Sequence, residues 1–151
     1  VQKNGYFGDG ARTFPVGRTS DEKARLMKVT EESLYKGIEK AQAGNHLHDV
    51  SAAVQEHVEA AGYSVVRDLV GHGIGRNLHE EPSVPNYGTP GTGLILKEGM
   101  ALAIEPMVNA GSHRVQVASD GWTVRTADGK PSAHFEHTII IRKGEADILT
   151  R

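Results

Sequence analysis

The sequence contains no cysteine, has almost no excess of either charge, and lacks any long apolar run. Without cysteine, disulfide scaffolds, thiolate-bound zinc and thiol nucleophiles are excluded. The 17 basic and 19 acidic residues nearly cancel and only 5% of residues are aromatic, so we expect neither nucleic acid nor a membrane as a partner. No stretch approaches the roughly 18 apolar residues that a membrane span needs, and we expect a cytoplasmic location.

Histidine and glycine are plentiful instead, with 8 and 18 copies among 151 residues. The length suits a single domain over residues 1–151, because a chain of this size can bury about two thirds of its unfolded surface. Any functional site is therefore expected to use imidazole and carboxylate groups, in a chain with many tight turns.

Two amphipathic helices are expected in the first half of the chain. Thr19 and Glu22 fit a capping box that opens the first helix, and Gly44 ends it. The second helix is expected over residues 49–61, closed by Gly62. Before these helices, residues 1–17 look like extended runs around a turn at Asn4.

After the second helix the pattern changes to short strands. These are expected at residues 63–67, 94–96, 100–105, 114–118, 122–126, 133–142 and 148–149, with a loop over 77–93 and a hairpin turn at 119–121. Two helices followed by hairpin-connected strands favour an α+β fold with a mainly antiparallel sheet.

Several familiar catalytic motifs are absent. The segment His79-Glu80-Glu81-Pro82-Ser83 begins like H-E-x-x-H but ends in serine, and its proline opposes a helix. The glycines at 71, 73 and 75 do not have the dinucleotide-binding spacing, and neither a P-loop nor a G-x-S-x-G elbow occurs. Dinucleotide binding, P-loop phosphoryl transfer and serine hydrolysis are therefore excluded.

Four acidic or imidazole residues stand in unusual local settings. His72 lies among glycines at a predicted strand end, Glu105 ends an apolar strand, and Asp9 lies between two glycines. Strand alternation puts Glu136 on the same face as His134, which suggests a polar row lining a cavity. Taken singly, each has an ordinary alternative as a turn, loop or exposed edge residue. Together they form a hard nitrogen and oxygen donor set that suits Mn, Fe, Co or Zn.

Three ordered segments carry a resemblance to a known family. They are Gly71-His72-Gly73-Ile74-Gly75, Ile104-Glu105-Pro106 and Ala133-His134-Phe135-Glu136-His137-Thr138. With Gly8-Asp9 and the separations between them, these segments closely resemble type I methionine aminopeptidase over essentially the whole chain. The resemblance implies the pita-bread fold, in which helices back a curved antiparallel sheet, and a metal-bound hydroxide that removes N-terminal methionine from nascent polypeptides.

The resemblance also assigns residue roles. Two divalent ions (Co, Mn, Fe or Zn) would be bridged by Asp9 and Glu136, with His72 and Glu105 completing one metal shell. Glu105 would also move the proton of the attacking water, and His79 would contact the scissile peptide and stabilise the oxyanion. Leu78 and Trp122 would line the pocket for the methionine side chain. The implied partners are nascent chains, with possible ribosome association, and the full-length protein is expected to be a monomer.

Two features depart from the family pattern. Phe7 stands where the family usually has histidine, and the family's first aspartate ligand would fall just before Val1. Residues 1–151 are therefore expected to be the C-terminal part of a single catalytic pita-bread domain, incomplete at the N-terminus. Two competing interpretations are a non-catalytic pita-bread module that binds peptides or proteins, and a truncated, inactive fragment.

Overall fold

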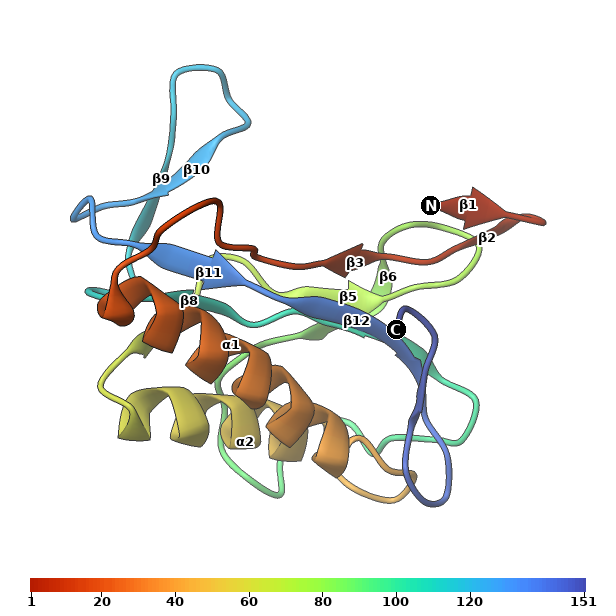
Figure 1. Ribbon diagram of the computed structural model, residues 1–151. Helices are drawn as coiled ribbons and strands as arrows, with labels where there is room; N and C mark the ends of the chain where they lie inside the picture. The colour runs from red at the N-terminus through yellow and green to blue at the C-terminus, as the bar shows by residue number, and fades with distance from the viewer.

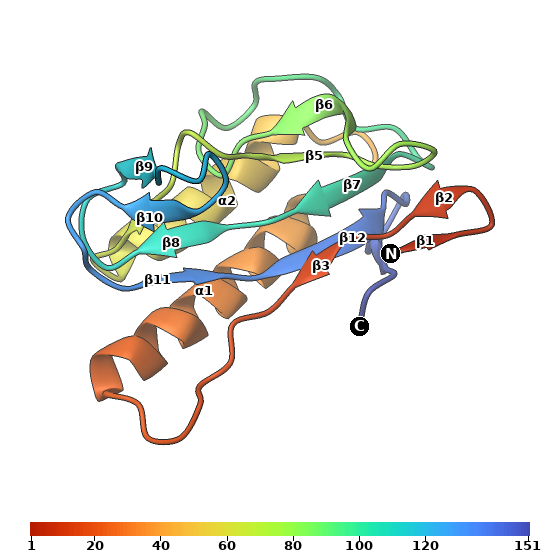
Figure 2. The same ribbon diagram turned by 90° about the horizontal axis from the view of Figure 1, so that it is seen from above.

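The computed structural model describes residues 1–151 and has two layers, with a pair of helices packed against one face of a β-sheet (Figure 1). The helices are α1 (Asp21–Lys40) and α2 (Leu47–Ala60), which lie side by side. Seen from above, the strands cross over both helices (Figure 2). Neither helix is long and apolar enough to cross a membrane.

The central sheet has six short strands. Five follow the order β13-β12-β7-β5-β6, β3 also pairs with β12, and all these pairs are antiparallel. Their bounds are β3 (Gly10–Ala11), β5 (Gly71–Gly73), β6 (Glu80–Val84), β7 (Ala101–Ile104), β12 (Glu136–Ile140) and β13 (Asp147–Ile148).

The other strands form one three-stranded sheet and two hairpins. The sheet has the order β11-β8-β4, and the hairpins are β1-β2 and β9-β10. Their bounds are β1 (Gln2–Lys3), β2 (Tyr6–Phe7), β4 (Ser64–Val65), β8 (Met107–Asn109), β9 (Val115–Val117), β10 (Val124–Thr126) and β11 (Ser132–His134). The β9-β10 hairpin projects from the side of the sheet that faces away from the helices (Figure 1). The α+β class, the antiparallel pairing and the hairpin at residues 119–121 are confirmed.

One apolar cluster joins the helices to the sheet. It includes Leu34 and Ile38 from α1, Val54 from α2, and Leu102 and Ile139 from neighbouring strands, each at most 7% exposed. Burying such side chains is the main stabilising contribution to a domain of this size. The sheet therefore has one face committed to the core and another available for a site.

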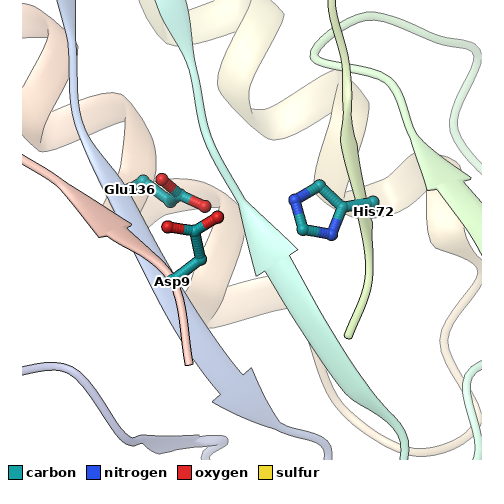
Figure 3. Close-up of side chains that lie close together, drawn as sticks. All are labelled: Asp9, His72 and Glu136. Atoms are coloured by element: carbon teal, nitrogen blue, oxygen red, sulfur yellow. The ribbon is translucent and has the colours of Figure 1, made fainter. Parts of the chain in front are cut away.

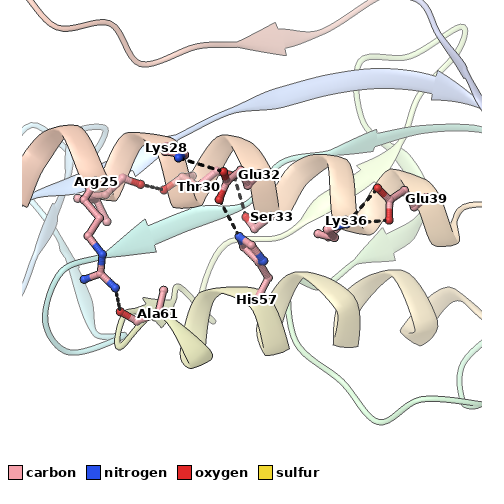
Figure 4. Close-up of polar contacts among 10 residues, drawn as sticks. Arg25, Lys28, Thr30, Glu32, Ser33, Lys36, Glu39, His57 and Ala61 are labelled. Atoms are coloured by element: carbon pink, nitrogen blue, oxygen red, sulfur yellow. Dashed lines mark hydrogen bonds and ion pairs between the residues drawn. The ribbon is translucent and has the colours of Figure 1, made fainter.

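Polar contacts complete the helix pair (Figure 4). His57 Nε2 lies 3.2 Å from Glu32 Oε2, and Arg25 donates to the carbonyl of Ala61 at 2.8 Å. The N-cap of α1 is Ser20, whose hydroxyl accepts from the N–H of Lys23, and not the predicted Thr19. The second helix begins two residues earlier than predicted, at Leu47, because His46 is its N-cap and donates its N–H to Asp49 Oδ2 at 2.8 Å in a capping box.

Three predictions about the strands were wrong or incomplete. The predicted loop over residues 77–93 contains β6, a charged, proline-containing segment that is a strand because it pairs with β5. The predicted strand at 94–96 forms only an isolated bridge, between Ile95 and His46. The predicted strand over 133–142 is divided at Phe135, whose N–H donates to the carbonyl of Pro106.

Candidate metal centre

Asp9 and Glu136 come together through the pairing of β3 with β12. Ala11 lies opposite Glu136 and Gly10 lies opposite His137, so Asp9 immediately precedes the paired residues. Glu136 is 6% exposed and Asp9 is half-buried. Their carboxylates lie side by side, with the His72 ring facing them from β5 (Figure 3). Two carboxylates far apart in the sequence therefore share one site.

His72 was predicted at the end of a strand, but it occupies the middle of β5. The glycines on either side allow close strand packing, because a Cβ at Gly71 would clash with the carbonyl of Ala103, and one at Gly73 with that of Glu81. The His72 Nδ1 lies 2.9 Å from the carbonyl oxygen of Gly73. A bond donated from Nδ1 leaves Nε2 as the free nitrogen for a ligand.

Between His72 and β12 the sheet carries only a small side chain. Ala103 of β7 lies opposite His72 on one side and opposite Thr138 on the other. Residues opposite one another in an antiparallel pair place their side chains on the same face. The methyl group of Ala103 therefore leaves the space between the histidine and the two carboxylates open.

Glu105 follows β7 and lies between two histidines. Its Oε1 is 3.5 Å from His72 Nε2, and its Oε2 is 3.5 Å from His134 Nε2. The Glu105 side chain is 14% exposed, and its carbonyl accepts from the amide of Asn86 at 3.1 Å. Glu105 thus joins the same site from the end of a fourth strand.

The donor geometry fits a metal ion. Asp9, His72 and Glu136 each offer one ligand atom, and these atoms lie within 4.8 Å of one another. Carboxylate oxygens and imidazole nitrogen are hard donors that suit divalent first-row metals. The carboxylates of Asp9, Glu105 and Glu136 crowd the site, so a bound cation would relieve their mutual repulsion.

The pKa of Glu136 reflects both burial and this repulsion. Burial is the largest cause, and together with the nearby carboxylates of Glu105 and Asp9 it raises the pKa of Glu136 to about 8. Such a carboxyl is protonated at neutral pH unless a cation is bound, since a cation favours the ionised form.

The histidines line a cavity of about 470 Å³ next to the carboxylates. His72, His79, Glu105 and His134 lie on its wall, which continues into apolar side chains such as Met107. The rings of His72 and His79 meet edge to face, with 4.3 Å between their centres. Asp9 and Glu136 instead line a separate hollow of about 830 Å³. The proposed ligands are thus divided between two openings, with His72 and Glu105 on the wall of one and Asp9 and Glu136 on the wall of the other.

Two predicted substrate-pocket residues lie away from this wall. Leu78 is half-buried in the loop before β6, and Trp122 is 88% exposed in the turn between β9 and β10. Neither lines the 470 Å³ cavity. Their assignment to a methionine pocket therefore rests on the resemblance alone.

His134 was not among the predicted site residues. Its Nε2 is buried with no hydrogen-bond partner, although it lies 3.5 Å from Glu105. The strand alternation that placed His134 on the face of Glu136 was the signal that could have identified it.

A cluster of hard donors on one face of an antiparallel sheet, with helices covering the other face, is a candidate metal centre in a fold of the pita-bread type. Residues 1–143 match the family model described as metallopeptidase family M24, and the chain belongs to this family.

Methionine aminopeptidases are among its similar proteins. The chain is 59% identical to "Methionine aminopeptidase" of Clostridium perfringens over 97% of its length, and 57% identical to "Methionine aminopeptidase 1" of Bacillus subtilis over 98%. The crystal structure of methionine aminopeptidase from Thermotoga maritima superposes with a TM-score of 0.96 at 54% identity, over 98% of this chain and 59% of that one. The chain spans 59% and 60% of the lengths of the two curated relatives.

Proposed function

We propose that the protein carrying this chain is a metal-dependent aminopeptidase that removes N-terminal methionine from polypeptides. The observation that carries the proposal is the convergence of Asp9, His72 and Glu136 within 4.8 Å, with Glu105 beside His72. The similar proteins named methionine aminopeptidase support the choice of substrate. Residues 1–151 would then be the metal-bearing part of one catalytic domain.

In this proposal the residues that would hold two divalent ions, Co, Mn, Fe or Zn, are Asp9, His72, Glu105 and Glu136. Bound divalent ions lower the pKa of water and polarise a carbonyl group, which is the chemistry that peptide hydrolysis needs. The free Nε2 of His72 and the buried carboxylate of Glu136 support these assignments.

The chain's own residues would move the protons and orient the peptide. Glu105 accepts a proton from the attacking water and passes it to the leaving amine, acting first as base and then as acid. His79 lies on the cavity wall beside His72, where its N–H can donate to the oxyanion as the tetrahedral intermediate forms. Leu78 and Trp122 are proposed to contact the methionine side chain.

Further parts of the proposal concern the whole protein. We propose nascent chains as substrates, a cytoplasmic location and a monomeric state, with ribosome association as the means of meeting these substrates. Because basic and acidic residues nearly balance, nucleic acid is not proposed as a partner.

The test is methionine release from a Met-Ala peptide by the metal-loaded protein, with Glu105→Gln as the variant. Losing general acid–base catalysis should lower kcat by roughly 10²–10⁴-fold. Glu98→Gln is the matched control, because the Glu98 side chain is 49% exposed and outside the site. Near-normal turnover by Glu105→Gln would remove Glu105 from its proposed role. A protein that neither binds nor needs a transition metal would favour a peptide-binding module.

A further inference from the structure

The pairing that brings Asp9 to Glu136 is very short. Only two residue pairs join β3 to β12, namely Ala11 with Glu136 and Gly10 with His137. A two-residue strand has few backbone hydrogen bonds to hold it, yet one proposed metal ligand, Asp9, immediately precedes it, and another, Glu136, pairs with it. The residues just beyond each end of this pairing are therefore important for where Asp9 lies.

At one end, a threonine hydroxyl replaces the missing backbone bonds. The N–H of Asp9 donates to Thr138 Oγ1 at 2.9 Å, and the same hydroxyl donates to the carbonyl of Asp9 at 2.8 Å. Thr138 is 1% exposed, so water does not compete for these bonds. Both backbone polar groups of Asp9 thus depend on one side chain.

The backbone of Thr138 cannot make these bonds because the C-terminal segment already occupies it. The Thr138 N–H donates to Thr150 Oγ1 at 3.1 Å, and the Thr138 carbonyl accepts from the N–H of Leu149 at 2.9 Å. Along this edge, β12 pairs with β3 up to His137 and with β13 from Ile139 onward. Thr138 lies at the change between the two, which is where Asp9 needs a partner.

The other end has the same arrangement with the roles of the strands exchanged. The N–H of His134 donates to Thr13 Oγ1 at 3.0 Å, and Thr13 Oγ1 donates to the carbonyl of His134 at 2.8 Å. Thr13 and Thr138 thus clasp opposite ends of one register. Only Thr138 holds the backbone of a proposed metal ligand. Thr13 makes the same two hydrogen bonds elsewhere and therefore serves as a matched control.

We propose that Thr138 is a positioning residue for the metal centre, which acts by fixing the backbone of Asp9. The proposal rests on the proposed function, because it takes Asp9 as a ligand. The Asp9 carboxylate itself accepts only from the N–H of Gly10, at 3.0 Å, so its direction follows from the backbone that Thr138 holds. Groups that orient a ligand in this way typically change metal affinity by 10–100-fold when they are removed.

The contacts of Thr150 extend the same device. Thr150 Oγ1, which accepts from the N–H of Thr138, also lies 2.9 Å from His137 Nδ1. His137 Nε2 in turn lies 3.3 Å from the hydroxyl of Tyr35 on α1. The clasp on Asp9 is thereby connected to the helical layer through the half-buried Thr150 and His137 and the exposed Tyr35.

The experiment compares Thr138→Val, Thr138→Ser and Thr13→Val in the protein that carries this chain. Calorimetric titration with Co²⁺ gives the metal affinity, the visible absorption of bound Co²⁺ reports ligand geometry, and thermal unfolding without metal reports stability. Thr138→Val should bind Co²⁺ about 10–100-fold more weakly, with an altered spectrum. Thr138→Ser keeps the hydroxyl and should return affinity to within about threefold.

Thr13→Val should lose stability to a similar extent and still bind Co²⁺ with nearly unchanged affinity. The proposal is overturned if Thr138→Val retains the original affinity, if Thr13→Val loses as much affinity, or if Thr138→Ser fails to restore it. Should Thr138→Val not fold, Thr138→Ala makes the same comparison without an added methyl group. Absence of Co²⁺ binding in the unaltered protein, or full affinity in Asp9→Asn, would instead overturn the proposed metal centre.

Discussion

Buried side chains on the two faces of the central sheet have opposite effects on stability. On the face toward the helices, Leu102 and Ile139 lie in the apolar core, each fully buried. On the other face, Glu136 is almost as well buried but is surrounded by like charges. Burial of the leucine stabilises the fold, whereas burial of an ionised carboxylate opposes it. The helix-facing face therefore contributes stability, and the opposite face uses part of it to hold a site.

The largest expected effect lies on the helical side. Leu34→Ala removes a side chain that is 1% exposed in the core, and should lower the free energy of unfolding by about 2–5 kcal/mol. Urea denaturation measures the change, with Leu94→Ala as the control because Leu94 is 36% exposed. Equal effects of the two substitutions would mean that the helical layer does not supply the core.

A substitution on the metal side should change the free energy of unfolding by a similar amount, but should raise it. Glu136→Gln removes a carboxyl whose pKa is raised to about 8 and should stabilise the metal-free protein at pH 7 by about 2–3 kcal/mol. If Glu136 is a metal ligand as proposed, the same change should weaken Co²⁺ binding, because the amide of glutamine is not anionic. Urea denaturation in a chelating buffer and calorimetric titration measure the two effects. Destabilisation of the metal-free protein would contradict the crowding of charge.

The pH dependence of stability sharpens the same contrast. Because folding raises the pKa of Glu136 from 4.5 to about 8, the folded state holds a proton that the unfolded state has lost between these values. The metal-free protein should therefore lose stability as pH rises from 4.5 to 8, by at most about 1.4 kcal/mol per pH unit from this group. The unfolding free energy of Glu136→Gln, subtracted at each pH, isolates this contribution. A difference that does not change over this range would exclude it.

The helices and the hairpin turn were predictable because they depend on local signals. Amphipathic periodicity and end signals identify α1 and α2, and Ser119-Asp120-Gly121 identifies the β9-β10 turn. The strand β6 was missed because its charged sequence pairs only through contact with β5. The sequence also does not show why residues 71 and 73 are glycines, since their role, to let neighbouring strands approach, depends on the sheet pairing.

For the site, the residue types were predictable and their convergence was not. Sequence spacing carries no geometry between Asp9 and Glu136, which meet only through the register of β3 on β12. The family resemblance supplied the set of ligands where the residues alone left it open. It did not indicate His134 beside Glu105 or the hydroxyl of Thr138 on Asp9, because both depend on the three-dimensional positions of side chains.

The smallest expected effect returns to the helical layer, on its outer surface. Glu32→Gln removes the charge that Lys28 approaches at 3.8 Å within α1 and that His57 approaches at 3.2 Å from α2 (Figure 4). Glu32 is 45% exposed, so solvent screens the pair and the loss should stay below about 1 kcal/mol. Urea denaturation at low and high salt measures it, and the small difference from the unaltered protein should shrink further in high salt. A loss as large as that of Leu34→Ala would show that charge, and not apolar burial, holds α1 against α2. In that case charged groups would determine stability on both faces of the sheet, and the two faces would differ only in how those charges are paired.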